Sequence, residues 1–431
     1  MPRFLLLFLA LVALFNASRV LREPRPGADR PMDFRTCYVG QAVLRAGQNP
    51  YHDGTLKRGW QRIVQQEHLT SHSQPGLPNL PFLYPPWAAA LFGLTVGQLP
   101  YVWAWPLWAA LALLSLGLLT RWWPRLLRTE GTQPGPWWHF LVAAVALKGT
   151  VPALLTGQPT FAALALGVGA LVVGARTKSI TPELPRALPS AGESSAVPAL
   201  RACAAGALLG LAAFKVTLLL PFVAWFLWKK QWLTLGAAAA VVLLLSAVAW
   251  HWAAFPADLV PTYQRLLAQV RAQSFDPADP LYPLTQGMTL RLELGNVLEW
   301  LRPGSSAWHG LLHGALWLAA GLRLGWLRQQ GVRLADWYAF LVVSTLTLLT
   351  TYHLYYDAVL LLPLLALVPR LPKPLRWLLL VLLLPLLLPL NGLALALGNP
   401  VGLQFVYFLM PLTLLGVLLL LLAKPVPENR P

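Results

Sequence analysis

The chain has 431 residues, of which 57% are hydrophobic and only 11% are charged, and its mean hydropathy is +0.56. Soluble domains carry roughly 25% charged residues, so this composition excludes an ordinary water-soluble protein. The net charge of +17 does not indicate nucleic-acid binding, because the basic residues form short clusters between apolar runs, which is the pattern that sets membrane orientation. The two cysteines, Cys37 and Cys203, do not indicate a disulfide framework.

Apolar runs long enough to cross a bilayer recur along the whole chain, and these Leu- and Ala-rich runs show no alternation, which favours helices over a barrel. We therefore predict an all-α polytopic membrane protein. The expected spans, paired between basic clusters, are 138–155 with 159–175, 201–214 with 216–228, 231–254 with 307–325, 334–351 with 356–369, and 375–397 with 402–423.

The first apolar run, from Phe4 to Phe15, resembles a signal peptide, but no small-residue cleavage site follows it, so we expect an uncleaved anchor. If the basic clusters are cytoplasmic, residues 20–85 and 255–306 form two outer-face loops. Segment 86–100 is expected to be a half-helix or re-entrant piece before a spanning helix at 101–122. The arginines that follow the anchor would lie outside, against the usual bias of basic residues toward the cytoplasm. Either the orientation of the first segment is inverted, or these arginines bind an anionic ligand at the outer face.

Acidic residues are scarce, 16 against 33 Lys and Arg, so Asp33 at the edge of a membrane segment is a candidate for chemistry. Pro31-Met32-Asp33 precedes a helical run to Ala46, and Asp is a favoured N-cap, so helix capping explains Asp33 without any function. The functional interpretation is a general base whose pKa is raised by partial desolvation.

Lys215 has long apolar stretches on both sides. A lysine at the bilayer centre costs roughly 2.5–3.5 kcal/mol on insertion scales, which makes it a functional candidate. The alternative is that its ammonium group snorkels to the interface. A phosphate group is a natural partner for this cation.

Tyr352-His353-Leu354-Tyr355-Tyr356-Asp357 is the densest polar and aromatic cluster near a membrane boundary. An interfacial aromatic belt accounts for it. Alternatively, His353 donates to a phosphate or leaving group while Tyr352 and Tyr356 line a sugar or lipid site.

Two further polar residues lie in expected outer segments. Gln158 is suited to bond a hydroxyl group or to cap a helix, and Arg291 to pair with a phosphate, Glu293 or Glu299. The histidine pairs at 68/72 and 309/313 mimic metal ligands, but neither has a third ligand at convincing spacing, so we predict no metal site.

The order of several motifs resembles glycosyltransferase family 87, the polyprenyl-phosphate-mannose-type mannosyltransferases of bacterial envelopes. The motifs that carry this resemblance, which extends to about residue 368, are Asp33-Phe34, Gly47-Gln48-Asn49-Pro50-Tyr51, Phe82-Leu83-Tyr84-Pro85-Pro86, Gly157-Gln158, Ala205-Gly206 with Gly210 to Lys215, and His353 before Leu361-Leu362-Pro363.

The resemblance implies a GT-C-like bundle of about 11–13 transmembrane or re-entrant helices. Residues 1–368 are expected to form the catalytic module, and residues 369–431 the C-terminal transmembrane helices with a short cytoplasmic tail. Two departures leave the donor and the acceptor open: Thr285-Gln286-Gly287 replaces an Asn-Gln-Ser-like motif, and Tyr352-His353 replaces a paired histidine.

The expected function is transfer of a hexose, with mannose favoured, from a polyprenyl monophosphate to a hydroxyl acceptor on a lipid, glycan or protein. The enzyme is expected to be inverting and to work at the outer face of the cytoplasmic membrane. The expected roles are Asp33 as catalytic base; Lys215, Arg291 and His353 for the donor phosphate; and Tyr84, Gln158, Tyr51, Tyr352 and Tyr356 for the sugar and acceptor.

No cofactor is expected, although a divalent-metal requirement and the oligomeric state are left open. Membrane lipids are expected partners, and nucleic acid is not. Two alternatives remain: an envelope oligosaccharide polymerase or ligase that uses a diphosphate-linked donor, and a lipid or solute transporter. A donor assay separates the first from the favoured function, and a transporter needs no carboxylate base.

Overall fold

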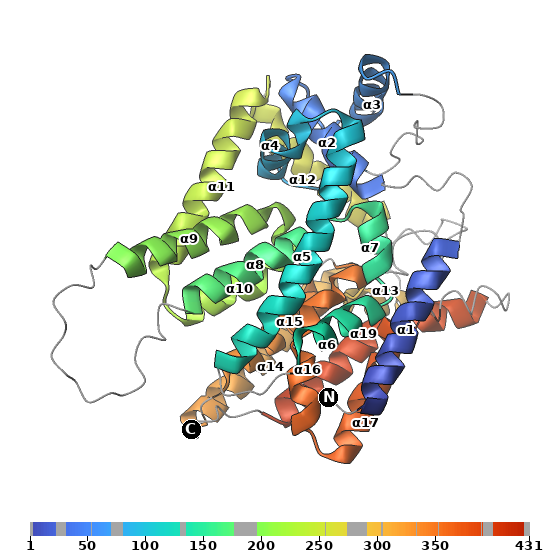
Figure 1. Cartoon of the computed structure of the whole chain (residues 1–431), viewed down its shortest axis with the longest axis vertical. Coiled ribbons are helices and arrows are strands. Elements are labelled where there is room, and N and C mark those ends of the chain that lie inside the picture. Colours follow the sequence, from blue (N-terminus) through green and yellow to red (C-terminus); the bar gives the residue numbers. More distant parts are fainter. Residues whose placement is uncertain are drawn as a thin grey trace. The chain divides into compact units, whose positions relative to one another are not determined.

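The computed structural model describes residues 3–22, 32–52, 54–69, 81–129, 135–175, 196–254, 256–273, 291–302, 305–332, 334–351, 353–388, 390 and 400–425. Over these ranges the named elements are all helices (Figure 1), and no β-sheet is formed. The predicted all-α class is confirmed.

The chain divides into two units. The first unit contains residues 1–23, 123–153 and 268–431, and the second contains residues 24–122 and 154–267. The expected limit of the catalytic module at residue 368 stays a prediction.

The second unit holds the predicted base and lysine. Two of its helices, α5 and α12, continue past its limits. Its elements are α2 (Met32–Arg45), α3 (Thr55–Gln66), α4 (Pro86–Leu94), η1 (Val96–Gln98), α5 (Tyr101–Thr129), α8 (Thr160–Ala175), α9 (Ala196–Ala212), η2 (Ala213–Lys215), α10 (Val216–Trp228), α11 (Trp232–Trp252) and α12 (Pro256–Gln273).

The first unit holds the predicted arginine and histidine of the donor site. Its elements are α1 (Arg3–Arg22), α6 (Trp137–Ala146), α7 (Thr150–Thr156, which ends in the second unit), α13 (Gly295–Leu301), α14 (Ser306–Gln329), α15 (Asp336–Thr350), η4 (Tyr355–Leu361), α16 (Leu364–Leu367), η5 (Val368–Arg370), α17 (Lys373–Leu387) and α19 (Pro400–Ala423).

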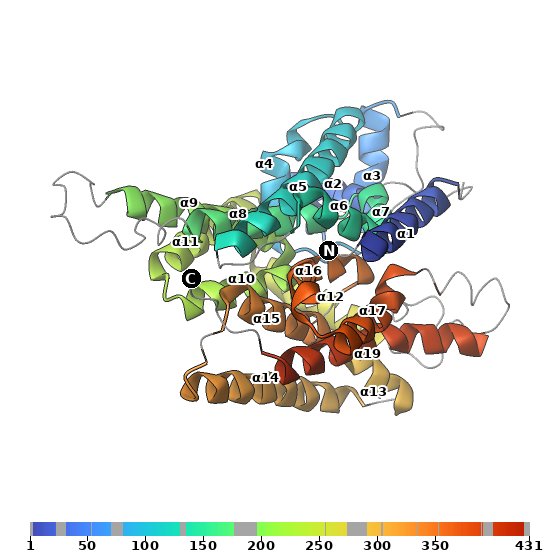
Figure 2. The ribbon, with the colours of Figure 1, turned by 60° about the horizontal axis from the view of Figure 1, so that its bottom comes forward.

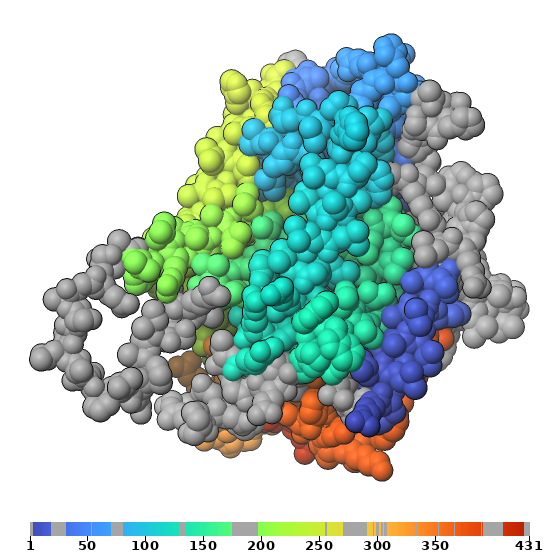
Figure 3. All heavy atoms as spheres, viewed as in Figure 1, coloured from blue at the N-terminus to red at the C-terminus, as the bar shows by residue number. Residues whose placement is uncertain are grey.

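Three described stretches are long and apolar enough to cross a membrane, namely Tyr101–Arg128, Val197–Trp228 and Trp232–Trp252. Shorter apolar helices of 10–17 residues accompany them. Along α5 the large apolar side chains Val102, Trp103, Leu113 and Leu114 are exposed, and Figure 3 shows this helix at the molecular surface. Exposed apolar surface of this extent on a helix of spanning length is expected to contact lipid.

The predicted span 138–155 is not one helix. It forms α6 and α7, which bend by 78° at a short break. A Cβ added to Gly149 in this break would come 2.5 Å from Tyr356 Cα, so the glycine permits a close approach of two backbones. The amide of Lys148, freed by the break, donates to Leu386 O at 3.0 Å. The sequence pattern did not predict this break.

Close packing in the second unit depends on two glycines of α9. A Cβ on Gly206 would lie 2.3 Å from Thr234 O, and one on Gly210 would lie 2.7 Å from Ala238 O. A step of four residues along α9, from Gly206 to Gly210, matches a step of four residues in the same direction along α11, from Thr234 to Ala238. The two helices therefore run parallel, and their backbones are in contact, as small-xxx-small motifs allow.

The segment between α9 and α11 must therefore fold back. If α10 continued along α9, Trp228 would lie about 33 Å from Gly206, beyond the roughly 20 Å that the six residues to Thr234 can span. The chain thus reverses near η2, as the pairing of segments 201–214 and 216–228 predicts, and Figures 1 and 2 show the helices α9, α10 and α11 that follow one another here. Lys215 is the last residue of η2.

Candidate active site

Asp33 lies in the first turn of α2, where a carboxylate interacts favourably with the helix dipole. Its neighbour Phe34 is fully buried and its ring contacts four aromatic rings with centroids 5.6–6.0 Å away, those of Tyr38, Tyr101, Trp105 and Trp108. Complete burial of one phenylalanine contributes roughly 1.5–3 kcal/mol. This anchor fixes the beginning of α2 against α5, and with it the partly buried Asp33.

The Asp33 carboxylate is surrounded by groups from distant parts of the sequence. Thr156 and Gln158 donate side-chain hydrogen bonds to it, and the ammonium group of Lys215 acts on it through its charge. Burial raises the pKa of Asp33 above its ordinary value, while the two hydrogen bonds and the cation partly oppose that rise. A carboxylate with a raised pKa inside a polar cluster is a typical feature of functional sites.

The turn that supplies both donors is shaped by Gly157, whose φ of +73° is in the left-handed region. A Cβ there would lie 2.6 Å from Phe34 Cβ and 2.8 Å from Trp105 Cζ3. The indole of Trp108 donates to Gly157 O at 2.9 Å. Only glycine allows this turn to lie so close to the beginning of α2, which explains the Gly157-Gln158 motif.

Lys215 ends the short 3-10 segment η2, where the regular helix is interrupted. The carbonyl of Ala213 in that segment accepts a hydrogen bond of 2.9 Å from the Trp87 indole. Lys215 Nζ donates to Thr160 Oγ1 at 2.5 Å. Thr160 is the first residue of α8, directly after the turn that carries Gln158. The lysine is therefore held by the same turn that bonds Asp33.

Tyr84 and Tyr51 are connected to this cluster through Cys37. Cys37, one helical turn after Asp33, shares a side-chain hydrogen bond with Tyr84, and burial followed by the charge of Asp33 raises the pKa of this thiol. The Tyr51 hydroxyl donates to Tyr84 O at 2.8 Å, and its ring lies 4.9 Å from that of Tyr263. Burial also raises the pKa of Tyr51, so its hydroxyl is neutral near neutral pH.

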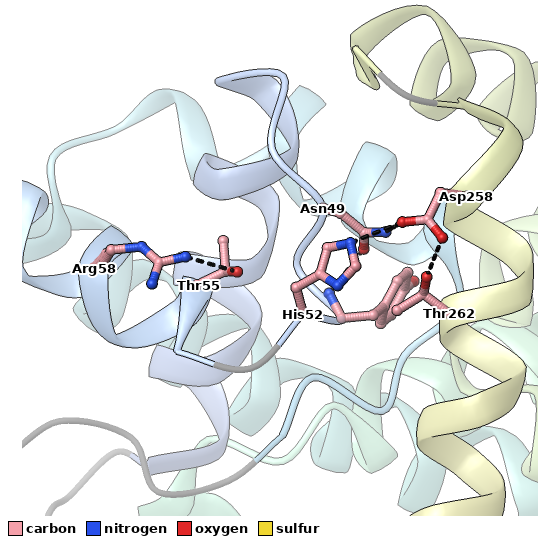
Figure 4. Close-up of polar contacts among 7 residues, drawn as sticks. Asn49, His52, Thr55, Arg58, Asp258 and Thr262 are labelled. Atoms are coloured by element: carbon pink, nitrogen blue, oxygen red, sulfur yellow. Dashed lines mark hydrogen bonds and ion pairs between the residues drawn. The ribbon is translucent and has the colours of Figure 1, made fainter.

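The Gly47–Tyr51 motif is attached to α12 by a polar cluster (Figure 4). The Asp258 carboxylate accepts hydrogen bonds from Asn49 Nδ2 at 3.2 Å and Thr262 Oγ1 at 2.8 Å, and His52 Nε2 lies 2.7 Å from it. Hydrogen bonding, first of all from Thr262, lowers the pKa of Asp258. Asn49 also accepts from the Tyr51 amide at 3.0 Å, so this cluster shapes the turn that carries Tyr51.

In the first unit, two predicted phosphate ligands are neighbours. Arg291 is 3% exposed and forms an antiparallel bridge with Leu354, while the amide of Leu292 donates to His353 O at 2.9 Å. His353 is fully buried, and its Nδ1 lies 2.9 Å from Asp357 Oδ2. Its Nε2 is also buried, and none of the described residues supplies a hydrogen-bond partner for it.

The structure thus brings Asp33, Gln158, Lys215, Tyr84 and Tyr51 together in the second unit. In the first unit it brings the backbones of Arg291 and His353 together, while Tyr356 lies in η4 against Gly149. Tyr352 and the Thr285–Gly287 segment lie outside the described residues. Both cysteines, Cys37 and Cys203, are free. Among the side chains that the structure describes, no three His, Cys, Asp or Glu residues are grouped as metal ligands.

Sequence reasoning missed three polar partners: Thr156, Thr160 and Asp357. The threonines flank Gly157-Gln158, but threonine is too common near helix ends to signal a role. Asp357 follows His353 by four residues, the spacing that brings side chains together on one helical face. That spacing is the one signal in the sequence that pointed to the pair.

Comparison with known families gives a match that covers more than half of the chain. The profile of glycosyltransferase family 87 matches residues 82–351. No curated protein and no solved structure gives a significant match. The matched range includes Tyr84, Gln158, Lys215 and Arg291 but not Asp33. Since the match covers more than half of the sequence, the chain belongs to glycosyltransferase family 87.

Proposed function

We propose that this glycosyltransferase moves a hexose, with mannose favoured, from a polyprenyl monophosphate to a hydroxyl group of a lipid, glycan or protein acceptor. The reaction inverts the anomeric carbon and takes place at the outer face of the cytoplasmic membrane. The observation that supports this proposal best is the Asp33 carboxylate, with its two neutral donors and the charge of Lys215.

Asp33 is the general base. The acceptor oxygen attacks the anomeric carbon and its proton passes to the Asp33 carboxylate, while the carbon–oxygen bond to phosphate breaks and its electron pair stays on the phosphate oxygen. The raised pKa of Asp33 improves its match to a proton-accepting role near neutral pH. Thr156 and Gln158 hold the carboxylate in one orientation, which lowers the entropic cost of reaching the transition state.

Lys215 stabilises the charge that develops on the departing phosphate. A preorganised cation in a water-poor site is commonly the largest single contribution to such a step. Lys215 ends the 3-10 segment that follows α9, and its ammonium group donates to Thr160. These two features hold the ammonium group near the carboxylate. No nucleotide is required, which fits the absence of a phosphate-binding glycine loop from the sequence.

The remaining roles are assigned by chemistry. Tyr51, Tyr84 and Gln158 are assigned to sugar and acceptor hydroxyls, because the two tyrosines offer aromatic surface and Gln158 offers an amide that donates and accepts hydrogen bonds. Arg291 and His353 are assigned to the donor phosphate, and Tyr352 and Tyr356 to the sugar. The buried Nε2 of His353 supports its assignment, since a buried polar atom is normally hydrogen-bonded.

The donor class is tested in membranes that contain the purified, reconstituted enzyme. A radiolabelled polyprenyl-phosphate mannose is expected to transfer its sugar to a membrane-derived acceptor, while a polyprenyl-diphosphate oligosaccharide is not. Transfer from the diphosphate donor alone would instead indicate a polymerase or ligase.

The proposed outer face is tested by cysteine labelling. In a Cys37→Ala and Cys203→Ala background, a cysteine replacing Ser71 is expected to react with an impermeant maleimide in intact cells. In the same background, a cysteine replacing Lys230, which is exposed and lies in a basic cluster, serves as the control and is expected to react only after permeabilisation. The reverse pattern overturns the assigned face.

A further inference from the structure

One carboxylate of α12 contacts two residues of the turn that carries Tyr51. Asp258 Oδ2 accepts from Asn49 Nδ2 at 3.2 Å and lies 2.7 Å from His52 Nε2 (Figure 4). The other oxygen, Oδ1, accepts from Thr262 Oγ1 at 2.8 Å within α12. Hydrogen bonding, first of all from Thr262, lowers the pKa of Asp258, so this carboxylate is ionised near neutral pH and only accepts hydrogen bonds. The turn is therefore bound to α12 both before and after Tyr51.

The side-chain amide of Asn49 transmits this contact to the backbone. Its Nδ2 donates to Asp258, and its Oδ1 accepts from the Tyr51 amide at 3.0 Å. Because Nδ2 and Oδ1 belong to one planar group, an amide bound at Nδ2 presents Oδ1 in a fixed direction. An asparagine that bonds the backbone two residues further on forms an Asx turn, which determines the local path of the chain. Asp258 therefore fixes the direction in which the Tyr51 side chain leaves the turn.

Tyr51 in turn holds the segment that carries Tyr84. Tyr51 is buried, and its hydroxyl donates to Tyr84 O at 2.8 Å. Its ring lies 4.9 Å from that of Tyr263 on α12, and the Tyr263 hydroxyl donates to Leu83 O at 3.3 Å. The two residues that follow Tyr84 are prolines, which supply no backbone donor. Two tyrosine hydroxyls thus fix two consecutive carbonyls of this segment.

The Tyr84 side chain is connected to the surroundings of the base. It shares a hydrogen bond with the Cys37 thiol, and Cys37 follows Asp33 by one turn of α2. The Asp33 carboxylate has its own side-chain donors, Thr156 and Gln158. A displacement of Tyr84 is therefore expected to change the contacts of the substrate more than the position of the base.

We infer that Asp258 is a positioning residue for the binding of the donor sugar by Tyr84. It acts in two steps, through Asn49 on Tyr51 and then through the Tyr51 hydroxyl on the backbone of Tyr84. The inference rests on the proposed function for the nature of the substrate. The Asp258 side chain is 43% exposed, so water replaces part of the hydrogen bonding that a substitution removes. The expected effects are therefore moderate.

The kinetic test compares Asp258→Asn with Asp258→Glu in the full-length reconstituted enzyme. Asparagine has one acceptor oxygen in place of two and no charge, whereas glutamate keeps both oxygens and the charge. We expect the KM for polyprenyl-phosphate mannose to rise roughly tenfold in Asp258→Asn, as for loss of one hydrogen bond, with kcat changed less than about threefold. Asp258→Glu restores part of the wild-type KM. A purely structural role would lower the amount of active enzyme, and thus the maximal rate, but leave KM unchanged.

A double-mutant cycle tests whether Asp258 acts through Tyr51. Tyr51→Phe removes the hydroxyl and keeps the buried ring, and we expect the donor KM to rise by a similar factor. In the Tyr51→Phe background, Asp258→Asn is expected to raise KM by less than about twofold, because coupled residues are not additive. Tyr338→Phe is the matched control and keeps the wild-type KM. It also removes a buried tyrosine hydroxyl that donates to a backbone carbonyl, that of Leu421 in the first unit.

The second measurement reports on Tyr84 without any substrate. In a Cys203→Ala background, Cys37 is the remaining thiol; it is 1% exposed and shares its hydrogen bond with Tyr84. A displaced Tyr84 uncovers this thiol, and the reactivity of a cysteine depends on its exposure. We expect N-ethylmaleimide to alkylate Cys37 roughly tenfold faster in both single variants of the cycle, while the control keeps the slow rate.

The outcomes separate this inference from the proposed function. If the wild type transfers no sugar from a monophosphate donor but alkylation is faster in Asp258→Asn, the proposed function is wrong and the link from Asp258 to Tyr84 stands. If the wild type transfers sugar and a folded Asp258→Asn protein keeps the wild-type KM and alkylation rate, the inference is wrong and the proposed function stands. An unchanged alkylation rate in Tyr51→Phe overturns the inference even where Asp258→Asn does not fold. Effects of the two substitutions that multiply in KM also overturn it.

Discussion

Lys215 Nζ donates to Thr160 Oγ1 at 2.5 Å, and this contact joins the turn at the end of α9 to the turn that carries Gln158. The two residues are 55 positions apart in the sequence, and together they place a cation next to Asp33. The bond restricts an otherwise flexible lysine side chain, so its loss is expected to affect the charge at the site more than the fold.

Thr160→Val tests this contact. Valine keeps the branched shape but accepts no hydrogen bond, so we expect kcat to fall about tenfold, equivalent to roughly 1.4 kcal/mol for a bond to a charged group. Thr120→Val is the control, because Thr120 is equally buried and donates its hydrogen bond to Gly117 O within its own helix α5. Equal kcat values for the two variants would contradict the role given to Thr160.

Lys215→Gln tests the coupling between the lysine and Asp33. The Lys215 charge lowers the pKa of Asp33, against the larger effect of burial. Removal of the charge therefore raises that pKa further, and the base is deprotonated only at higher pH. We expect the acid limb of the kcat–pH profile to move to higher pH, together with a roughly 10²-fold lower maximum.

Lys230→Gln is the control for that profile, since Lys230 is exposed and lies at the far end of α10. Its profile is expected to match the wild type. An acid limb that moves to lower pH in Lys215→Gln, or does not move at all, is incompatible with Asp33 as the titrating base.

Gly157→Ala tests the turn beside Asp33. Alanine with φ near +73° costs roughly 1–2 kcal/mol, and its Cβ would lie 2.6 Å from Phe34 Cβ. The turn must move, and its two donors move away from the carboxylate. We expect a lower Tm and a loss of kcat larger than the loss of stability explains.

Gly331→Ala separates the two effects in Gly157→Ala. Gly331 has a similar φ of +76°, but a Cβ there meets no atom within 4 Å. This variant is expected to lose a comparable amount of backbone stability and to keep its kcat. Normal kcat in Gly157→Ala would show that the turn is not needed for chemistry.

Gly206→Ala tests the parallel packing of α9 on α11. The added methyl would lie 2.3 Å from Thr234 O, so the two helices must separate. Overpacking of this kind costs typically 1–3 kcal/mol, and we expect a lower Tm in detergent. Gly236→Ala on α11 meets no atom within 4 Å, and alanine is the better helix former, so its Tm is expected to stay or rise. A Gly206→Ala protein with wild-type Tm would exclude backbone contact between α9 and α11.

Much of the fold was predictable because apolar runs of spanning length are the strongest signal in a membrane-protein sequence. The short segment 86–100, the helix that follows Pro31, and the reversal at Lys215 all agree with the structure. Lys215 was noticeable because a lysine within a long apolar run is costly.

Other features depend on tertiary contacts that no local pattern encodes. At the break at Lys148-Gly149, Tyr356 lies against the glycine, although the two are far apart in sequence. Asp33 resembles a simple helix cap in the sequence, whereas its side-chain hydrogen bonds go to Thr156 and Gln158. Such partners become visible only when the chain is folded.

The central claim is that Asp33 is the catalytic base, and its most direct test is transfer from polyprenyl-phosphate mannose by Asp33→Asn and Asp33→Ser. Both substitutes are compatible with the beginning of a helix, but neither accepts a proton as a carboxylate does. We expect folded variants whose kcat falls by roughly 10²- to 10⁴-fold, the usual contribution of a general base. Wild-type transfer by both variants would contradict the account.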